Sequence, residues 1–325
     1  MEFKNSILET KTLNSTFPYE KVIHIALAID EPFVPPAGIL ITSILKNNPA
    51  RNFFVHIFLD KISQSSIERL QKFCKLSNKI QIKIYYVNPT LFKNLYFDKN
   101  YSVAIFYRIV AADILADELD EMIYMDSDML CLKSMEELFQ NSSKEYLLKA
   151  VADSGRWLAE HKRNLNLSAD FRYFNAGILY LNLKKWRQEK ISAQLIELLR
   201  NSDYNLPDQD TLNMIAYRNN YAIEYLPKKF NHFFRLDGTE IPITDDVVIE
   251  HFAGNLKPWY LWCDSEVKQL YESYQAESFW SDFKYLPKNY QECRFMGNVF
   301  RRNGNWLEAF KWYVKYVENK FKKFF

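Results

Sequence analysis

The chain has 325 residues, of which 48% are hydrophobic and 16% are aromatic, and only 7 are glycine. This composition predicts a folded globular protein with a large core and excludes fibrous and low-complexity classes. The net charge of +2 does not indicate nucleic acid as a partner. Between Lys288 and Phe325, however, nine Lys or Arg residues stand against three Glu, so the C-terminal part is basic.

Two features favour the cytoplasm. The first twenty residues are polar and mixed in charge, without the apolar core of a signal peptide, and no apolar run of about 18 residues follows. The four cysteines are far apart and match no zinc spacing, so we expect reduced thiols at Cys74, Cys131, Cys263 and Cys293.

Strands and helices alternate in the first part of the chain. After a loosely held extension over residues 1–21, apolar runs predict three strands, at residues 22–28, 53–59 and 80–87. Helical spacing predicts helices between them, at residues 38–46 and 63–76. We expect Pro32, Pro35 and Pro36 to act as breakers before the first helix. This order is typical of a mostly parallel sheet with helices on its faces.

The central motif is Asp126-Ser127-Asp128, which follows a short apolar run at residues 122–125. Successive side chains of an extended strand point to opposite faces, so Asp126 and Asp128 share a face with Ser127 between them. Two carboxylates this close repel unless a cation or strong donors compensate, and such oxygen ligands suit Mg²⁺ or Mn²⁺. Ligands of open α/β sheets bind at the carboxyl ends of strands. From these residues alone, a cation site and a polar turn are equally open.

A helix is expected at residues 102–115, just before this motif. Arg108 lies on a different face from its apolar residues, and a lone helical arginine is usually solvated. After the motif, apolar runs predict strands at residues 146–152 and 173–183, the first of which ends at Asp153.

A helix is then expected at residues 184–200, and Pro207-Asp208-Gln209-Asp210 has the pattern of another helix start. Acids in a first turn complement the helix dipole, so simple capping explains Asp208 and Asp210 when they are considered alone.

A last short strand, at residues 247–250, runs into the segment from His251 to Trp259. A neutral imidazole can join two carboxylates around a divalent cation. Gly254 lets the backbone approach a ligand, and Lys257 supplies a point charge for phosphate. A partly buried structural histidine is the more usual case, so this segment is ambiguous alone.

From residue 265 onward the pattern is helical, with two amphipathic segments at residues 290–300 and 305–325. The second mixes aromatic residues with lysines, which favours contact with an anionic membrane surface. The alternative is a helical hairpin that caps the main domain.

Taken together, these motifs resemble glycosyltransferase family 8, and within it the bacterial lipopolysaccharide core α-glucosyl and α-galactosyltransferases. The resemblance runs from about residue 22 to residue 262. It rests on six segments, in order: Ala28-Ile29-Asp30, Tyr107-Arg108, Tyr124-Met125-Asp126-Ser127-Asp128, Phe174-Asn175-Ala176-Gly177, Asp208-Gln209-Asp210 and His251-Phe252-Ala253-Gly254-Asn255-Leu256-Lys257-Pro258-Trp259.

The resemblance implies a GT-A type α/β fold, with a mostly parallel central sheet flanked by helices. The glycosyltransferase domain would occupy residues 22–264, between an N-terminal extension and a basic helical region at residues 265–325 for acceptor or membrane association. The implied enzyme is a retaining, metal-dependent hexosyltransferase. It would move glucose or galactose from a UDP-sugar to a lipopolysaccharide or lipooligosaccharide core acceptor, peripherally at the inner face of the cytoplasmic membrane.

The same resemblance implies roles for individual residues. Asp126, Asp128 and His251 would hold Mn²⁺ or Mg²⁺ at the donor diphosphate. Gln209 would lie on the face of the anomeric carbon opposite the leaving group, with Asp208 and Asp153 as further catalytic residues. The implied donor-binding residues are Ala28, Asp30, Arg108, Asp126, Ser127, Asp128, Asn175, His251, Gly254 and Lys257.

The sequence also departs from the family and leaves alternatives. Pro32-Phe33 stands where many relatives have Asn-Tyr, which removes an amide and a hydroxyl near the nucleotide. Gln209 is a poor nucleophile, and a front-face route needs no covalent intermediate. One alternative is a noncatalytic carbohydrate-binding or membrane-associated relative. The other is a phosphatase of the haloacid dehalogenase kind, although its loop normally continues with Gly or Thr rather than Met129-Leu130.

Overall fold

The computed structural model describes residues 3–13, 21–95, 102–139, 145–233 and 242–322. The chain folds as two compact units. The first contains Met1–Phe233 and Ile243–His251, and the second is built from Phe252 onward. The division after His251 comes earlier in the chain than the expected domain boundary at residue 264.

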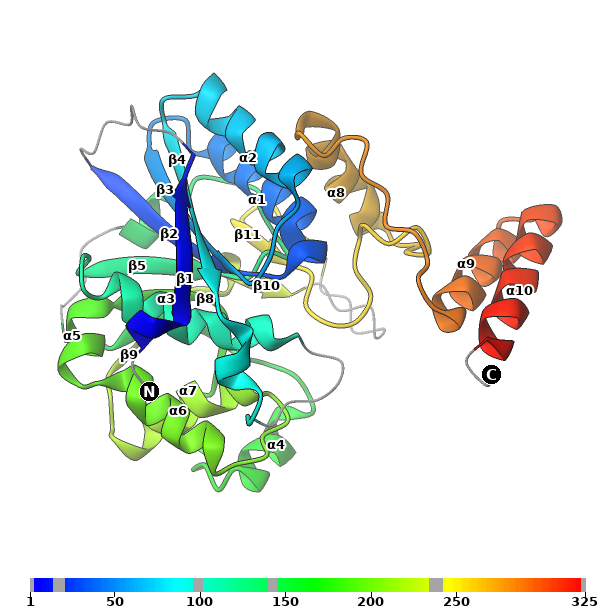
Figure 1. Ribbon diagram of the computed structural model, residues 1–325. Coiled ribbons are helices and arrows are strands. Elements are labelled where there is room, and N and C mark those ends of the chain that lie inside the picture. The colour runs from blue at the N-terminus through cyan, green and yellow to red at the C-terminus, as the bar shows by residue number, and fades with distance from the viewer. Residues whose placement is uncertain (1–2, 14–20, 96–101, 140–144, 234–241, 323–325) are drawn as a thin grey trace. The chain divides into compact units, whose positions relative to one another are not determined.

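An eight-stranded sheet forms the centre of the first unit (Figure 1), with strand order β1-β4-β3-β2-β5-β8-β7-β9. Strands β2 to β5 run parallel to one another, while β1 and β8 run antiparallel to their neighbours. The strands are β1 (Ile7–Thr12), β2 (Val22–Ala28), β3 (Asn52–Leu59), β4 (Ile80–Val87), β5 (Glu121–Met125), β7 (Leu148–Ala152), β8 (Phe174–Asn182) and β9 (Ile223–Leu226).

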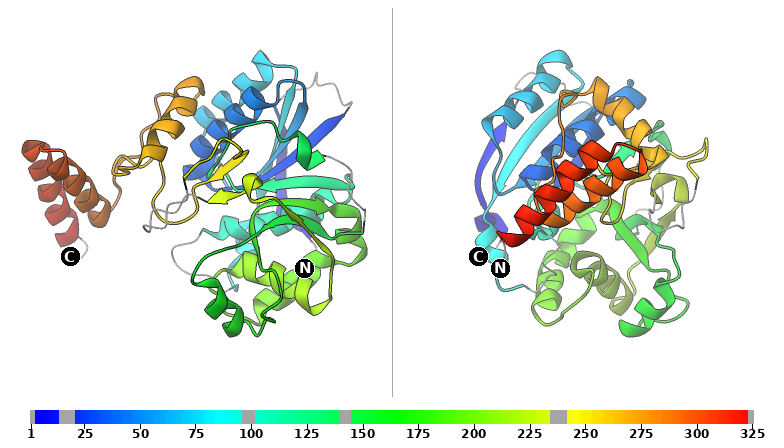
Figure 2. Two further views of the ribbon diagram at one scale, coloured as in Figure 1. Left: turned by 180° about the vertical axis from the view of Figure 1, so that it is seen from behind. Right: turned by 90° about the vertical axis from the view of Figure 1, so that its right-hand side faces the viewer.

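Helices cover both faces of this sheet (Figure 2), with α1 and α2 on one face and α3, α5, α6 and α7 on the other. Successive side chains of each strand point to opposite faces, so every strand contributes apolar side chains to both faces of the sheet. On the face covered by α3, Ala26, Phe58 and Tyr85 join the core. The helices are α1 (Val34–Asn47), α2 (Gln64–Leu76), α3 (Tyr107–Leu115), α4 (Leu158–Asn164), α5 (Leu183–Gln188), α6 (Ile191–Arg200) and α7 (Pro207–Arg218). Short 3-10 helices lie at Phe3–Ser6, Glu31–Phe33, Pro89–Phe92, Val103–Phe106, Glu136–Phe139 and Lys228–Phe230.

The expected loose extension at residues 1–21 is wrong for its described part. Ile7–Thr12 form strand β1, which pairs antiparallel with β4, and Phe3 is buried. Most side chains of β1 are exposed or half-buried. An edge strand of this kind carries little apolar pattern and is therefore hard to recognise from sequence.

Two expected helices differ in their bounds. Helix α1 begins at Val34, so Pro35 and Pro36 lie inside its first turn. Proline is tolerated there because the first N–H groups of a helix have no intrahelical partner. The helix expected at residues 184–200 is instead two helices, α5 and α6, separated at Lys190, whose φ of 52° is left-handed.

A second, three-stranded sheet has the order β10-β11-β6. Its strands are β6 (Met129–Cys131), β10 (His232–Phe233) and β11 (Ile249–His251). Strand β6 begins directly after Asp128 and pairs antiparallel with β11, with Met129 opposite His251. This pairing brings two segments together that are far apart in sequence.

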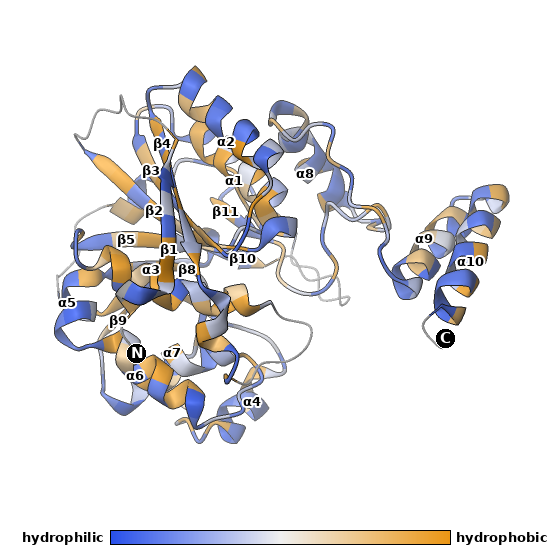
Figure 3. Ribbon diagram, in the orientation of Figure 1, coloured by the Kyte–Doolittle hydropathy of each residue, from blue (hydrophilic) through white to orange (hydrophobic). Residues whose placement is uncertain are grey.

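The second unit contains α8 (Glu266–Glu277), α9 (Tyr290–Arg302) and α10 (Trp306–Phe321). Helices α9 and α10 pack closely because Gly297 leaves room for the ring of Tyr313, whose hydroxyl donates to Asn298 Oδ1 at 2.9 Å. Polar and apolar residues mix along both helices, whereas strands β2, β3 and β5 of the central sheet are mainly apolar (Figure 3). Within the described ranges, no helix combines the length and apolar character needed to cross a membrane. All four cysteines are buried and none of them forms a disulfide, as expected.

Candidate metal and donor site

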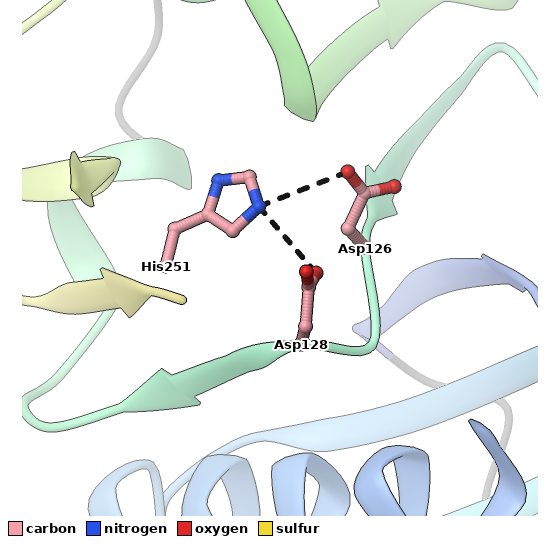
Figure 4. A group of neighbouring side chains, drawn as sticks. All are labelled: Asp126, Asp128 and His251. Carbon is pink, nitrogen blue, oxygen red and sulfur yellow. Dashed lines mark ion pairs between the residues drawn. The ribbon is translucent and has the colours of Figure 1, made fainter. Parts of the chain in front are cut away.

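Three side chains from the two sheets converge at one point (Figure 4). Asp126 follows β5, Asp128 precedes β6, and His251 ends β11. His251 Nε2 lies 3.4 Å from Asp128 Oδ1 and 3.9 Å from Asp126 Oδ2. One ligand atom of each residue lies within 4.8 Å of the others. This geometry can accommodate one divalent cation between an imidazole and two carboxylates.

The electrostatics of the site also fit a cation. Burial raises the pKa of Asp126, the Arg108 guanidinium opposes this change, and the charge of Asp128 raises the pKa further. The two carboxylates therefore repel each other at a place where solvent compensates their charges poorly. A divalent ion bound between them and the imidazole would relieve this repulsion.

Arg108 is a buried structural residue of the site and not the solvated helical arginine that its position on α3 indicated. Its Nη2 lies 3.0 Å from Asp126 Oδ1 and 2.8 Å from Asp208 Oδ2, and its Nη1 donates to Ala176 O at 2.8 Å. The planar guanidinium thus joins β5, β8 and α7. Tyr124 Oη also donates to Asp126 Oδ1, at 2.8 Å. With Oδ1 held by two donors, Asp126 Oδ2 faces His251.

Gln209 is held at both ends of its amide. Its Oε1 accepts from Asn175 Nδ2 at 2.8 Å and from the Ala176 backbone N–H at 3.0 Å. Its Nε2 donates to Asp153 Oδ2 and to Tyr173 Oη, both at 3.2 Å. The structure therefore brings Gln209, Asp153 and Asn175 together, and the four bonds leave Gln209 little rotational freedom.

The two acids beside Gln209 have different functions. Asp210 Oδ2 accepts from the Leu206 backbone N–H at 3.0 Å, so the expectation of simple capping is correct for Asp210. Its Oδ1 also bonds Tyr173 Oη at 2.5 Å and His161 Nε2 at 2.6 Å. For Asp208 capping is not the main interaction, because its carboxylate pairs with Arg108.

Two buried polar atoms lie near the end of β2, where Ala28 and Asp30 were expected to bind the donor. Neither Asp30 Oδ1 nor Tyr107 Oη has a hydrogen-bond partner within the part of the chain that the structure describes. Burial raises the pKa of Asp30, and a hydrogen bond from Ser102 opposes the change. Because buried polar atoms are nearly always paired, these two atoms are candidates for contact with a polar ligand.

The remaining predicted residues lie in two places. Ser127 is buried between the two aspartates. Gly254 and Lys257 belong to the second unit, where Gly254 has a φ of 103° that favours glycine. Lys257 is buried and its Nζ donates to Phe252 O at 2.8 Å.

Sequence reasoning missed four residues that shape the site: Tyr124, Tyr173, Gly177 and Asn231. Gly177 stood in a recognised motif without an assigned role. A Cβ at this position would lie 2.5 Å from Cε1 of His251, so only glycine leaves room for the imidazole. Asn231 belongs to no motif, and no local signal in the sequence could have identified it.

Most of the chain is similar to known proteins. Residues 24–263 match the family model described as glycosyl transferase family 8. The chain belongs to glycosyltransferase family 8. It is 27% identical over 332 residues to lipopolysaccharide 1,3-galactosyltransferase of Salmonella typhimurium, covering 96% of this chain and 97% of that protein. It is 29% identical to lipopolysaccharide glucosyltransferase WaaO of Escherichia coli, with 97% and 98% covered.

Solved structures show the same fold in this glycosyltransferase. The bifunctional glycosyltransferase WbbM superposes with a TM-score of 0.66 at 19% identity, over 83% of this chain and 52% of that one. Galactosyltransferase LgtC, crystallised with donor and acceptor sugar analogs, gives a TM-score of 0.63 at 21% identity, over 82% and 98%. The fold is therefore of the GT-A type, as expected. Family membership also decides against the phosphatase alternative.

Proposed function

We propose that this glycosyltransferase is a retaining, metal-dependent α-hexosyltransferase that moves glucose or galactose from a UDP-sugar to a lipopolysaccharide or lipooligosaccharide core acceptor. The observation that carries the proposal is the convergence of Asp126, Asp128 and His251 beside the amide network of Gln209. The names of the two relatives, one a galactosyltransferase and one a glucosyltransferase, support a hexose donor and this acceptor class.

Asp126, Asp128 and His251 would hold Mn²⁺ or Mg²⁺. When bound, such an ion acts as a Lewis acid on the departing diphosphate. Arg108 holds Asp126 in the orientation that exposes Oδ2. We further propose that the Lys257 ammonium and the Gly254 backbone contact phosphate oxygens, with Asp30 and Ala28 near the uridine.

Asp153, Asn175 and Asp208 would line the donor sugar, and Gln209 would face its anomeric carbon. Gln209 Oε1 already accepts two hydrogen bonds and its Nε2 already donates two. The amide is therefore a polar group that is held in one orientation. Such a group stabilises an oxocarbenium-like centre better than it attacks one. The acceptor hydroxyl would form the new bond on the face that UDP leaves, and its proton would pass to the departing phosphate oxygen.

A membrane surface is the proposed location of this reaction, at the inner face of the cytoplasmic membrane. Helix α10 exposes an apolar stripe at i, i+4, i+8, i+11 and i+15, and helical spacing places Lys311 and Lys320 on either side of it. The stripe consists of Trp306, Phe310, Val314, Val317 and Phe321, which are 40% to 68% exposed. At the surface of an anionic membrane, exposed aromatic side chains can enter the apolar layer while the lysines beside them contact the negatively charged headgroups.

A donor screen tests the proposal. Purified protein is incubated with UDP-glucose, UDP-galactose, UDP-N-acetylglucosamine or UDP-N-acetylgalactosamine, with Mn²⁺ or with EDTA, and UDP release is measured. We expect release from one of the two hexose donors, its loss in EDTA and its return with excess Mn²⁺. If no donor gives metal-dependent UDP release, the noncatalytic alternative replaces the proposal.

A further inference from the structure

Two backbone N–H groups of strand β8 determine how the side-chain amides near the candidate metal site are oriented. The Gly177 N–H donates to Asn175 Oδ1 at 2.8 Å, and the Ala176 N–H donates to Gln209 Oε1 at 3.0 Å. A backbone N–H can only donate, so both amide oxygens are identified by their partners. Asn175 Nδ2 then donates to Gln209 Oε1 at 2.8 Å.

The same reasoning extends from Asn175 to the histidine. Asn175 Oδ1 accepts, so the Asn231 atom 2.8 Å from it is the donor Nδ2. Asn231 Oδ1 therefore faces His251 Nδ1, at 2.9 Å. Because an amide oxygen only accepts, the hydrogen of the neutral imidazole lies on Nδ1. His251 Nε2 then presents its lone pair toward Asp126 and Asp128.

We propose that Asn231 is a positioning residue that holds His251 in the Nδ1–H tautomer and connects this histidine, through Asn175, to Gln209. Asn231 and His251 are both almost fully buried, at 1% and 4% exposure, so water does not easily replace either bond. The inference rests on the proposed function only for the identity of the ligand at Nε2. Partners of this kind fix the orientation of a metal-ligating histidine and raise its basicity.

The tautomer is measured on the metal-free protein at about pH 8, above the ordinary His pKa. Long-range ¹H–¹⁵N NMR distinguishes Nδ1–H from Nε2–H, and single His→Gln variants assign the five histidines. We expect His251 as Nδ1–H in the natural protein and a shift toward Nε2–H in Asn231→Ala. An Nε2–H tautomer in the natural protein, or an unchanged tautomer in the variant, overturns the proposal.

Two variants of Asn231 separate the two bonds that it makes. Asn231→Ala removes both, and we expect Mn²⁺ affinity measured by calorimetry to fall about 10- to 100-fold. Asn231→Asp still accepts from Nδ1–H but cannot donate to Asn175, so Mn²⁺ affinity is expected to stay near normal while kcat falls. Equal effects of both variants on Mn²⁺ affinity contradict the positioning role.

The exposed amide of Asn201 provides a matched control, because its hydrogen bond among the described residues is local, to Glu197 O. Asn201→Ala is expected to leave the tautomer, Mn²⁺ affinity and kcat unchanged. If the natural protein binds no Mn²⁺, the metal part of the proposed function fails. The metal-free NMR result still decides the role of Asn231.

Discussion

Asp128 is the ligand whose loss best separates metal binding from folding. Asp126 contributes to the fold through Arg108 and Tyr124, whereas Asp128 Oδ1 approaches His251. Asp128→Ala is expected to abolish metal-dependent UDP release and to leave the urea unfolding midpoint nearly unchanged. The surface variant Asp120→Ala should behave like the natural protein in both assays. Full activity of Asp128→Ala would remove the metal role of this residue.

Glycine is required at position 177 because a side chain there would collide with the ring of His251, not because of its backbone conformation. An added Cβ would lie 2.5 Å from Cε1 and 2.9 Å from Nδ1 of His251, closer than real contacts allow. Gly177→Ala is therefore expected to displace the imidazole and to weaken Mn²⁺ binding by at least about tenfold, as changes around a metal ligand typically do. Calorimetry measures the affinity, and circular dichroism checks the fold. Unaltered Mn²⁺ affinity would show that His251 does not need its present position.

At this scale the sequence identifies the candidate metal ligands more readily than the residues that position them. Asp126, Asp128 and His251 are identifiable because their residue types and motifs carry chemistry. Arg108 was misjudged from its helix alone, since burial depends on what packs against α3. Asn231 makes its contribution only through contacts between distant segments, and no spacing rule describes them.

At the scale of elements, strands β2 and β3 carry two neighbouring imidazoles, His56 buried and His24 half-buried, and we expect this pair to make stability depend on pH. His24 Nδ1 lies 3.0 Å from His56 Nε2, and His56 Nδ1 lies 2.9 Å from Tyr85 Oη. Burial lowers the pKa of His24. Burial also lowers the pKa of His56 to well below its ordinary value, and His24 and Lys83 lower it further.

The sign of the effect follows from proton uptake. Below about pH 6.5 the unfolded imidazoles bind protons that the folded ones do not, so stability falls as pH decreases until the folded groups titrate. The urea unfolding midpoint should therefore fall less between pH 7.5 and pH 5.5 in His56→Gln than in the natural protein. The slope is at most about 1.4 kcal/mol per pH unit for each proton. Identical pH dependence in both proteins would contradict this account.

Helix α10 carries the prediction about membranes. Replacing Trp306 and Phe310 together by Ser removes two exposed aromatic side chains, and binding to phosphatidylglycerol vesicles should fall by at least about tenfold. Leu76→Ser, which changes an exposed residue of α2, should bind normally. Unchanged vesicle binding would exclude the stripe as the contact surface. A change of oligomeric state in the double variant would instead assign the stripe to self-association.

Elements with strong apolar patterns were predictable, and those that depend on tertiary pairing were not. The bounds of β2 were predicted correctly at residues 22–28. The short strands β6 and β10 and the polar edge strand β1 were missed, because pairing rather than periodicity defines them. This matters for the site, since the β6–β11 pairing places His251 beside Asp128.

At the scale of the whole molecule, the family match and the fold agree that the chain is a glycosyltransferase. The match covers residues 24–263 and so includes Gly254 and Lys257 as well as the candidate metal ligands of the first unit. The sequence alone predicted the GT-A fold through the resemblance. The specific hexose is not predictable in this way, because glucose and galactose differ only in the direction of one hydroxyl.

The central claim is that Asp126, Asp128 and His251 hold the divalent cation of the donor site. Crystals grown with Mn²⁺ and UDP test it directly, because Mn²⁺ gives an anomalous difference peak. We predict one strong peak about 2.1 Å from a carboxylate oxygen of each aspartate and from His251 Nε2, in the range expected for hard divalent ions. A peak bound elsewhere, or UDP bound without any peak at these three residues, would contradict the account.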